Sequence, residues 1–352
     1  MSWVTALARP EIVALKPYEH AAWEPGVTRL HANELPWRAV HDESAAGLNR
    51  YPEPQSRAVI ERLAQLYRVA AEQLLICRGS DEAIDLLVRA FCGAQRDAVL
   101  VCPPTFGMYA TAARIQGAPI VTVPLAAERG FELDAPAILS NDSMPRVKLI
   151  FLCSPNNPTG NLLSEEAILR VVDALAGRAI VVVDEAYIEF SQRRSLAVQV
   201  AQRPQLAVLR TLSKAHGLAG ARLGTLIADP EVIALLRKLI APYAVPQVIL
   251  EAVTTLLSPR HLRVLPRRIR QIRAERSRLR RALGALPGVT AVLPSEANFL
   301  LARVADPAAA LARARAARLL VRDVRGVAGL EDALRISVGT RADNDRLLEA
   351  WQ

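Results

Sequence analysis

The chain has 352 residues, of which 51% are hydrophobic and 22% charged, and this composition excludes a disordered protein. No apolar run approaches the roughly 18 residues that a membrane span requires, so we expect no association with a membrane. The formal net charge of +9 would suit a nucleic acid or another anionic partner, and the distribution of the basic residues decides whether one is expected.

The first two thirds of the chain alternate short apolar runs with helix-length segments. Helical patterns cover residues 56–67 and 81–92, and a third helix is expected after Tyr109. The runs that we assign to strands are QLLIC, AVLVC, IVTVP, KLIFLC, AIVVVD, LAVLRT and LGTLIA. Strands that alternate with helices predict an α/β fold with a mostly parallel central sheet and helices on both faces. Such sheets bind ligands at the carboxyl ends of their strands.

The last third of the chain is organised differently. Strands are expected at VTAVLP, NFLLAR, LLVRDV and LRISV, with an Ala/Arg-rich helix over 308–320. This pattern predicts a smaller α+β domain. We divide the chain into an N-terminal arm that is also part of the small domain (1–35), a large domain (36–250) and a small C-terminal domain (251–352).

The densest basic run, LPRRIRQIRAERSRLRRAL, is typical of an amphipathic helix. Arginines alternate with apolar residues that recur at intervals of three and four, namely Leu265, Ile269, Ile272, Leu279 and Leu283. A nucleic-acid surface would favour aromatic residues between the basic ones, and this run contains none. We therefore expect a solvated helix face and no nucleic-acid partner. A basic surface would also favour small anionic substrates.

The cysteines and histidines show no metal-binding pattern. The four cysteines stand singly, without CxxC spacing, in or beside apolar runs, and the five histidines are scattered. We predict no metal. The segment 1–20 carries Arg9, Glu11 and Lys16 within apolar positions and lacks the order of a signal peptide, so the cytoplasm is the expected location.

Three polar motifs follow expected strands, where their side chains can converge on one edge of the sheet. KLIFLC leads into SPNNPTG, AIVVVD ends in DEAY, and LAVLRT leads into LSKAHGLAGARLG. One carboxylate at a strand end is more often structural. Three successive motifs that each carry an acceptor, a donor or an amine are difficult to explain by turn formation alone.

Lysine is scarce in this chain, and one lysine lies in the third motif. Of the 44 basic residues, four are lysines: Lys16, Lys148, Lys214 and Lys238. Arginine serves a solvated surface equally well, but its guanidinium does not deprotonate in water. A lysine amine that is desolvated or flanked by cations can become a nucleophile at neutral pH. Each lysine is therefore a residue to consider individually.

The order and spacing of these motifs resemble the fold-type I aminotransferases that use pyridoxal phosphate. The resemblance rests on SPNNPTG, DEAY, Lys214 after Ser213, Arg222 eight residues further on, and a late arginine in LRISVGT. NPTG or the Ser-Lys pair alone would be a weak signal, but the set is highly specific. Within the family, LKPYEH, LHANELPW, YPEPQ, DEAYIEF and VRDV resemble the histidinol-phosphate aminotransferases over nearly the whole chain.

The resemblance implies three catalytic residues, Lys214, Asp184 and Tyr187, and one further cofactor contact, Asn157. Lys214 would bond covalently to pyridoxal phosphate and move a proton at the substrate Cα, which requires a lowered pKa. Asp184 would keep the pyridine nitrogen protonated, with capping of a helix as the alternative. Asn157 and Tyr187 would contact the cofactor's 3′ oxygen, with turn formation and core packing as their alternative. Asn156 is expected to be a turn residue.

The cofactor phosphate needs donors, and CRGSDEAID supplies two at the start of an expected helix. The backbone N–H groups of Ser80 and Asp81 can face an anion there, although Ser80 would also serve as an ordinary N-cap. The resemblance adds Ser213 and Arg222. It also adds Tyr51 from the neighbouring subunit, which implies a homodimer with shared active sites.

Two positions depart from the family pattern. The family usually has tyrosine in the ring-stacking position, whereas this chain has Phe106, which keeps the aromatic face and loses the hydroxyl. His216 stands where family members more often have phenylalanine, and we expect a packing role for it.

Substrate recognition is implied for four residues, Arg322, Arg335, Tyr18 and Asn33, which would bind the phosphate of histidinol phosphate. Arg335 also matches the arginine that pairs with a substrate carboxylate in many family members, as 2-oxoglutarate or glutamate would require. A plain ion pair of Arg322 with Asp323 or another surface acid is the alternative. The implied reaction is the transamination of histidinol phosphate with 2-oxoglutarate in histidine biosynthesis.

Other functions stay open on sequence alone. An aromatic amino-acid aminotransferase would need a plain carboxylate site and a roomier apolar pocket. A threonine-phosphate decarboxylase has similar motifs, but DEAF and TK are associated with it in place of DEAY and SK. A non-catalytic regulator would be expected to lack the lysine, and Lys214 is present.

Overall fold

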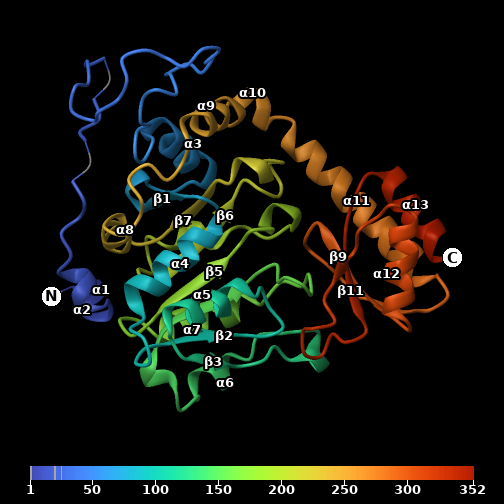
Figure 1. Ribbon diagram of the computed structural model, residues 1–352. Helices are drawn as coiled ribbons and strands as arrows, with labels where there is room; N and C mark the ends of the chain where they lie inside the picture. Colours follow the sequence, from blue (N-terminus) through green and yellow to red (C-terminus); the bar gives the residue numbers. More distant parts are fainter. Residues whose placement is uncertain (1, 20, 25) are drawn as a thin grey trace.

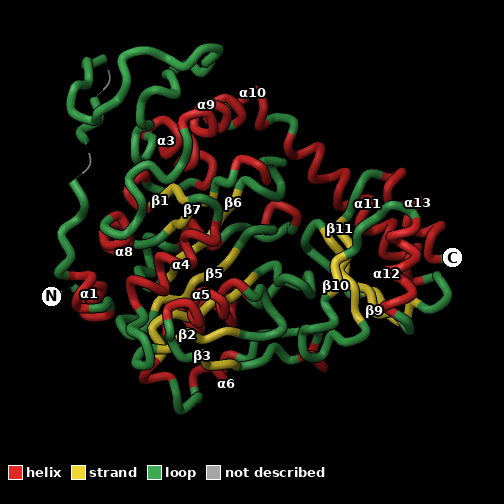
Figure 2. Tube along the Cα trace, viewed as in Figure 1, coloured by secondary structure: helices red, strands yellow, loops and turns green. Residues whose placement is uncertain are grey.

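The chain folds around two β-sheets (Figures 1 and 2). The computed structural model describes residues 2–19, 21–24 and 26–352. The larger sheet has the strand order β1-β7-β6-β5-β4-β2-β3. Its strands are β1 (Leu74–Cys77), β2 (Ala98–Val101), β3 (Ile120–Thr122), β4 (Val147–Cys153), β5 (Ile180–Asp184), β6 (Leu206–Thr211) and β7 (Gly224–Ile227).

The large sheet is mostly parallel, as the sequence predicts, and one strand is reversed. The pairs β2 with β3, β2 with β4, β4 with β5 and β5 with β6 are parallel. In contrast, β7 is antiparallel to both of its neighbours, β1 and β6. Because β7 runs backwards, its first residue, Gly224, pairs with Cys77 at the end of β1 and with Thr211 at the end of β6. Three distant segments therefore meet at one edge of the sheet.

Helices cover both faces of this sheet because both sets of alternating strand residues are apolar. Leu74 and Ile76 of β1 face one hydrophobic core, and Leu75 and Cys77 face the other. The first core is closed by α3 (Arg57–Tyr67), α6 (Ala135–Leu139), α7 (Glu165–Ala174) and α9 (Gln247–Leu256). The second is closed by α1 (Trp3–Leu7), α2 (Pro10–Val13), α4 (Ser80–Phe91), α5 (Met108–Gln116) and α8 (Pro230–Arg237). The α/β architecture expected from the sequence is confirmed.

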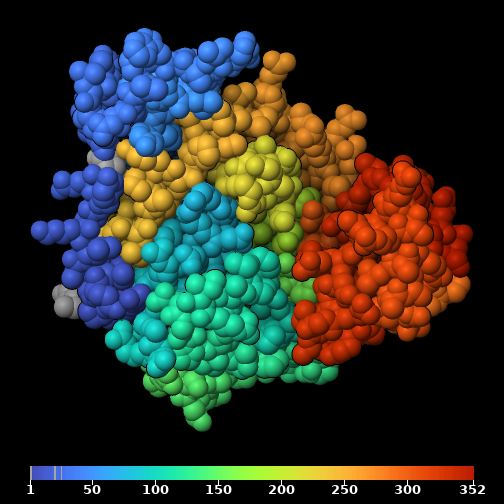
Figure 3. All heavy atoms as spheres, viewed as in Figure 1, coloured from blue at the N-terminus to red at the C-terminus, as the bar shows by residue number. Residues whose placement is uncertain are grey.

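The C-terminal part forms a second lobe with its own core (Figure 3). Its antiparallel sheet has the order β10-β11-β9-β8. The strands are β8 (Val289–Val292), β9 (Phe299–Val304), β10 (Arg322–Asp323) and β11 (Ala333–Ser337), and the helices are α11 (Leu265–Gly284), α12 (Pro307–Ala316) and α13 (Arg341–Trp351). The short helix α10 (Pro259–Leu262) precedes them and packs through Leu262 on the first core of the large sheet. The run LLVRDV thus contributes only the two residues of β10, fewer than expected. The predicted domain limits remain a prediction.

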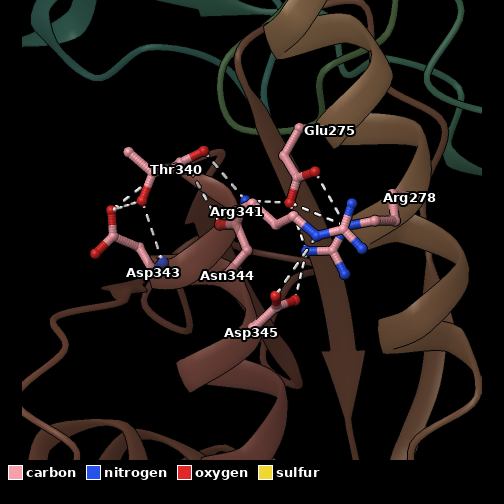
Figure 4. Close-up of polar contacts among 8 residues, drawn as sticks. Glu275, Arg278, Thr340, Arg341, Asp343, Asn344 and Asp345 are labelled. Carbon is pink, nitrogen blue, oxygen red and sulfur yellow. Dashed lines mark hydrogen bonds and ion pairs between the residues drawn. The ribbon is translucent and has the colours of Figure 1, made fainter.

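Polar side chains attach α13 to α11 (Figure 4). Arg278 forms ion pairs with Glu275 at 2.5 Å and with Asp345 at 2.6 Å. The amide of Asn344 donates to Glu275 at 2.9 Å. Thr340 caps α13 by accepting a hydrogen bond from the backbone of Asp343. The contacts of Arg278 with Asp345 and of Asn344 with Glu275 hold the C-terminal helix against the arginine-rich helix.

The arginine-rich face of α11 is solvated only in part, which corrects the sequence expectation. Arg276 is buried and donates to the carbonyl of Ala297 at 2.7 Å. Arg273 donates to the carbonyl of Phe190 at 2.9 Å, although Phe190 belongs to the segment that follows β5. Arg276 also donates to the Phe190 carbonyl at 3.4 Å, so both arginines join α11 to the segment that follows β5.

Candidate active site

Lys214 lies in the loop between β6 and β7, at the edge of the sheet where the three segments meet. Its Nζ is 5.7 Å from the ring centroid of Tyr187. Partial desolvation lowers the pKa of the Lys214 amine, and the positive charges of Arg335 and Arg222 lower it further. Since a neutral amine is the nucleophilic form, this environment prepares Lys214 for covalent chemistry.

Asp184, the last residue of β5, is buried beside this loop, with 3% of its surface exposed. Its Oδ2 accepts a hydrogen bond from the hydroxyl of Tyr109 at 2.7 Å, and its Oδ1 accepts one from the backbone of Ala186 at 3.0 Å. Burial raises the pKa of Asp184, while these two bonds and the Lys214 charge act in the opposite direction. The short helix that follows has Tyr187 as its N-cap, so the alternative of a helix-capping aspartate is not what the structure shows.

An anion cradle is formed where α4 begins next to β7. Gly79 is the N-cap of α4 with φ at +80°, and Ser80 is the first helical residue, which corrects the alternative of Ser80 as the cap. A Cβ on Gly224 would lie only 2.4 Å from the backbone carbon of Gly79 and the backbone nitrogen of Ser80. The two segments can approach this closely only because Gly224 has no side chain.

Arg222 and Ser213 complete this cradle from the loop that carries Lys214. The Arg222 guanidinium lies 3.4 Å from a carboxylate oxygen of Asp81. A Cβ added to Gly79 would lie 2.9 Å from a nitrogen of the same guanidinium. The backbone of Ser213 is held by the side chain of Thr211 at 3.1 Å. Backbone N–H groups at a helix start, a hydroxyl and an arginine are the donors that a phosphate requires. The residues present therefore fit a phosphorylated cofactor.

Arg335, on β11, brings the small sheet into the site. Its guanidinium donates to Oδ1 of Asn157, which turns the amide nitrogen of Asn157 away from Arg335. Arg322 is directly opposite Arg335 in the β10–β11 pair. Asp323 pairs with Arg325 at 2.7 Å, so the structure does not contain the ion pair between Arg322 and Asp323 that was the alternative.

Aromatic rings pack around these polar groups. Tyr187 meets Phe299 edge-on with centroids 5.1 Å apart, and the Arg335 guanidinium lies 5.3 Å from the same Phe299 ring. Phe106 meets the ring of Tyr109 edge-on at 5.6 Å. His216 is buried, and its Nε2 lies 3.8 Å from a carboxylate oxygen of Glu189. Burial lowers the pKa of His216, in keeping with a packing role.

Three of the expected site residues, Tyr18, Asn33 and Tyr51, lie outside this cluster, on the N-terminal segment at the blue end of Figure 1. The ring of Tyr51 stacks on Tyr243 with centroids 4.5 Å apart. Its backbone nitrogen donates to Glu34 at 2.7 Å. The roles of all three residues therefore remain proposals.

Sequence reasoning missed two features of the site. Tyr109 is the hydrogen-bonding partner of Asp184, and its signal was an aromatic residue in the first turn of a helix, three positions after Phe106. A buried ion cluster lies nearby: Arg210 pairs with Glu189 at 2.7 Å and with Glu185 at 3.6 Å. Its partners come from two segments far apart in the chain, and no local pattern would have found it.

Three features lie together at this end of the large sheet: a lysine amine with a lowered pKa, a buried carboxylate and a glycine-lined anion cradle. Together they define a pyridoxal-phosphate enzyme of the fold-type I class. The chain belongs to the family of class I and II aminotransferases, whose profile matches residues 29–350. The chain is thus a pyridoxal-phosphate-dependent aminotransferase.

One relative in sequence and two solved structures show which members of the family this chain is similar to. Histidinol-phosphate aminotransferase of Stenotrophomonas maltophilia is 50% identical over 99% of this chain and 96% of the relative. The crystal structure of histidinol-phosphate aminotransferase from Sinorhizobium meliloti in complex with pyridoxal-5'-phosphate superposes with a TM-score of 0.78 at 26% identity, over 86% of this chain and 82% of that one. L-threonine-O-3-phosphate decarboxylase from Porphyromonas gingivalis superposes with a TM-score of 0.73 at 26% identity, over 86% and 92%.

Among the described residues, no helix is both long and apolar enough to cross a membrane.

Proposed function

We propose that this protein transfers the amino group between histidinol phosphate and 2-oxoglutarate, as a step of histidine biosynthesis. In the biosynthetic direction it would convert imidazole acetol phosphate and glutamate. The observation that carries the proposal is the 50% identity, over nearly the full length of both chains, with a relative named for this activity. The two structural neighbours at 26% identity have different activities, so the fold alone does not choose between them.

The proposed division of labour follows from the contacts. Pyridoxal phosphate supplies an aldehyde for the amino group and a protonated ring that withdraws electrons. Lys214 would provide the amine that bonds to the cofactor and would move the proton at the substrate Cα. Asp184 would accept a hydrogen bond from the pyridine N–H. Tyr187 and the amide nitrogen of Asn157 would donate to the 3′ oxygen, and Phe106 would lie against the cofactor ring.

The phosphate of the cofactor is proposed to bind in the glycine-lined cradle. The backbone N–H groups of Ser80 and Asp81, the hydroxyl of Ser213 and the guanidinium of Arg222 would be its donors. In this arrangement Arg222 exchanges its ion pair with Asp81 for the phosphate. Tyr51 of the partner subunit would add a hydroxyl.

The substrate phosphate is proposed to bind Arg322 and Arg335, which lie opposite each other at the end of the small sheet. Two guanidinium groups on adjacent strands can hold one phosphate, or the carboxylate of 2-oxoglutarate or glutamate, in the same place. Burial lowers the pKa of Arg335 and the charge of Arg322 lowers it further, while Tyr187 acts in the opposite direction. Tyr18 and Asn33 would complete this site.

We also propose a homodimer in the cytoplasm. The N-terminal segment exposes large apolar side chains, among them Leu30 (92%), Val40 (86%) and Trp37 (76%). In Figure 3 this segment forms a projecting layer at the blue end of the chain. An exposed apolar surface of this kind is typical of a protein interface. The four cysteines are free and buried, as suits a reducing compartment.

Reduction of the purified protein with borohydride tests the first part of the proposal. The cofactor adduct should be found on Lys214, and the other three lysines serve as internal controls. Lys214→Ala should lose transamination. A variant that still transaminates at the wild-type rate would refute the assignment.

Substrate choice is tested by comparing histidinol phosphate with phenylalanine as amino donor. We expect histidinol phosphate to be strongly preferred, because its phosphate offers the two arginines more negative charge and more acceptor oxygens than the carboxylate of phenylalanine. Arg322→Ala should raise the KM for histidinol phosphate more than that for phenylalanine. Comparable turnover of phenylalanine by the wild-type enzyme would replace the proposed substrate and leave the aminotransferase chemistry in place.

A further inference from the structure

Tyr109 contacts two separate groups of the proposed cofactor site. It lies in the first turn of α5, three residues after Phe106, and its side chain is fully buried. Its hydroxyl donates to Oδ2 of Asp184 at 2.7 Å. Its ring meets that of Phe106 edge-on, with centroids 5.6 Å apart and planes at 85°. One side chain thus links the ring proposed to cover the cofactor with the acid proposed to contact its nitrogen.

Packing leaves Tyr109 little freedom to move. Its ring stacks on Phe151 of β4 with centroids 4.8 Å apart and planes at 5°. Phe151 is itself fully buried in the sheet. Because the second oxygen of Asp184 is held by the backbone of Ala186, the carboxylate is restrained at both oxygens. Tyr109 and the backbone together determine the direction in which Asp184 presents its remaining lone pairs.

The direction of the hydrogen bond also has an electrostatic consequence. An ionised carboxylate can only accept, so a phenol that donates to it stabilises the charged form. Burial raises the pKa of Asp184, and the bond from Tyr109 is the largest effect that opposes this rise. The other titratable groups that act on Asp184 or are acted on by it are Asp81, Cys153, Tyr187 and Lys214. Among these, only Lys214 brings a positive charge.

We propose that Tyr109 is a positioning residue that keeps the Asp184 carboxylate ionised and directed at the pyridine nitrogen of the cofactor. The inference rests on the role proposed above for Asp184. Without the hydroxyl, Asp184 would hold a proton more tightly, and the proton that it shares with the pyridine nitrogen would move toward the carboxylate. The ring would then withdraw fewer electrons, and the Lys214 nitrogen attached to it would become more basic.

The test uses Tyr109→Phe in the cofactor-loaded enzyme, with the pH titration of the bound cofactor's visible absorbance as the readout. We expect the midpoint to rise by about one pH unit, a tenfold change in proton affinity. We expect kcat to fall roughly tenfold with KM changed by no more than about twofold, because the bond acts on the reacting ring and does not touch substrate. A midpoint equal to that of the wild type would overturn the proposal.

Tyr67→Phe is the matched control, since Tyr67 is another fully packed tyrosine of the same domain that does not contact Asp184. It should leave the midpoint unchanged, and a shift as large as that in Tyr109→Phe would overturn the proposal. A ring-fluorinated tyrosine in place of Tyr109 is a stronger donor and needs no change in packing. The fluorinated residue should lower the midpoint of the absorbance titration, and a rise or an unchanged midpoint would contradict the proposal.

Asp184→Asn separates this inference from the proposal on which it rests. If Asp184→Asn shifts the absorbance titration and Tyr109→Phe does not, the role of Tyr109 is wrong and that of Asp184 stands. If Asp184→Asn leaves the titration unchanged, the proposed contact between Asp184 and the pyridine nitrogen is itself wrong.

Discussion

The close approach of Gly224 to the start of α4 allows a sharp prediction. In Gly224→Ala, the added Cβ would lie 2.4 Å from the backbone carbon of Gly79 and the backbone nitrogen of Ser80. Both are main-chain atoms of the junction between β1 and α4, so no side-chain rotation can relieve the contact. The junction has to move away from β7, and the N–H groups that would bind the cofactor phosphate move with it.

The expected cost can be worked out from the packing. Overpacking by one methyl group in a well-packed interior typically costs about 1 to 3 kcal/mol. An unfolding entropy of roughly 2.1 cal/mol/K per residue over this chain corresponds to about 0.7 kcal/mol/K. The midpoint of thermal unfolding should therefore fall by only about 1 to 4 °C. Cofactor affinity should fall more noticeably, by at least about tenfold, if the backbone shift costs two phosphate hydrogen bonds.

Gly220→Ala is the matched control, because Gly220 lies in the same loop, has no positive φ and has nothing within 4 Å of the position of an added Cβ. Cofactor affinity would be measured by titrating apo protein with pyridoxal phosphate, and stability by calorimetry. Gly220→Ala should behave like the wild type in both assays. If Gly224→Ala also bound the cofactor and unfolded like the wild type, the reasoning from backbone contact would be refuted.

Two further predictions concern buried charges. Arg276→Ala removes the hydrogen bond to the Ala297 carbonyl and should lower the free energy of unfolding, measured with denaturant, by about 1.5 to 3 kcal/mol. Arg281 is exposed, so Arg281→Ala should change the free energy of unfolding by less than about 0.5 kcal/mol. Equal losses in the two variants would contradict the structural role of Arg276. Burial raises the pKa of Asp184 above its ordinary 3.8, so between that value and the folded value the native apo protein binds more protons than the unfolded chain. The stability of the wild type relative to Asp184→Asn should therefore fall as pH rises through this window, and a flat or rising difference in unfolding titrations would contradict the raised pKa.

Much of the fold could be predicted from local patterns. A run such as AIVVV, apolar at every position, indicates a strand buried on both faces, because a strand with one solvated face would alternate. Helix-length segments between such runs then require a parallel sheet covered on both sides. The order of SPNNPTG, DEAY and the Ser-Lys loop placed Asn157, Asp184 and Lys214 at the ends of successive strands, and the structure has them there. Local sequence patterns were sufficient to predict these features, because each feature depends only on residues that are neighbours along the chain.

The sequence by itself determined the alternation of helices and strands and the mostly parallel class of the large sheet, and it singled out Lys214 as the proposed reactive lysine. Only the tertiary structure decided that β7 runs antiparallel between β1 and β6, which brings Gly224 against Gly79 from 145 positions earlier in the chain. It also decided that Arg335 reaches Asn157 and that Tyr109 donates to Asp184. Strand direction, register and such pairings depend on how whole layers pack, and a local pattern of residues contains no information about a partner that only packing brings near.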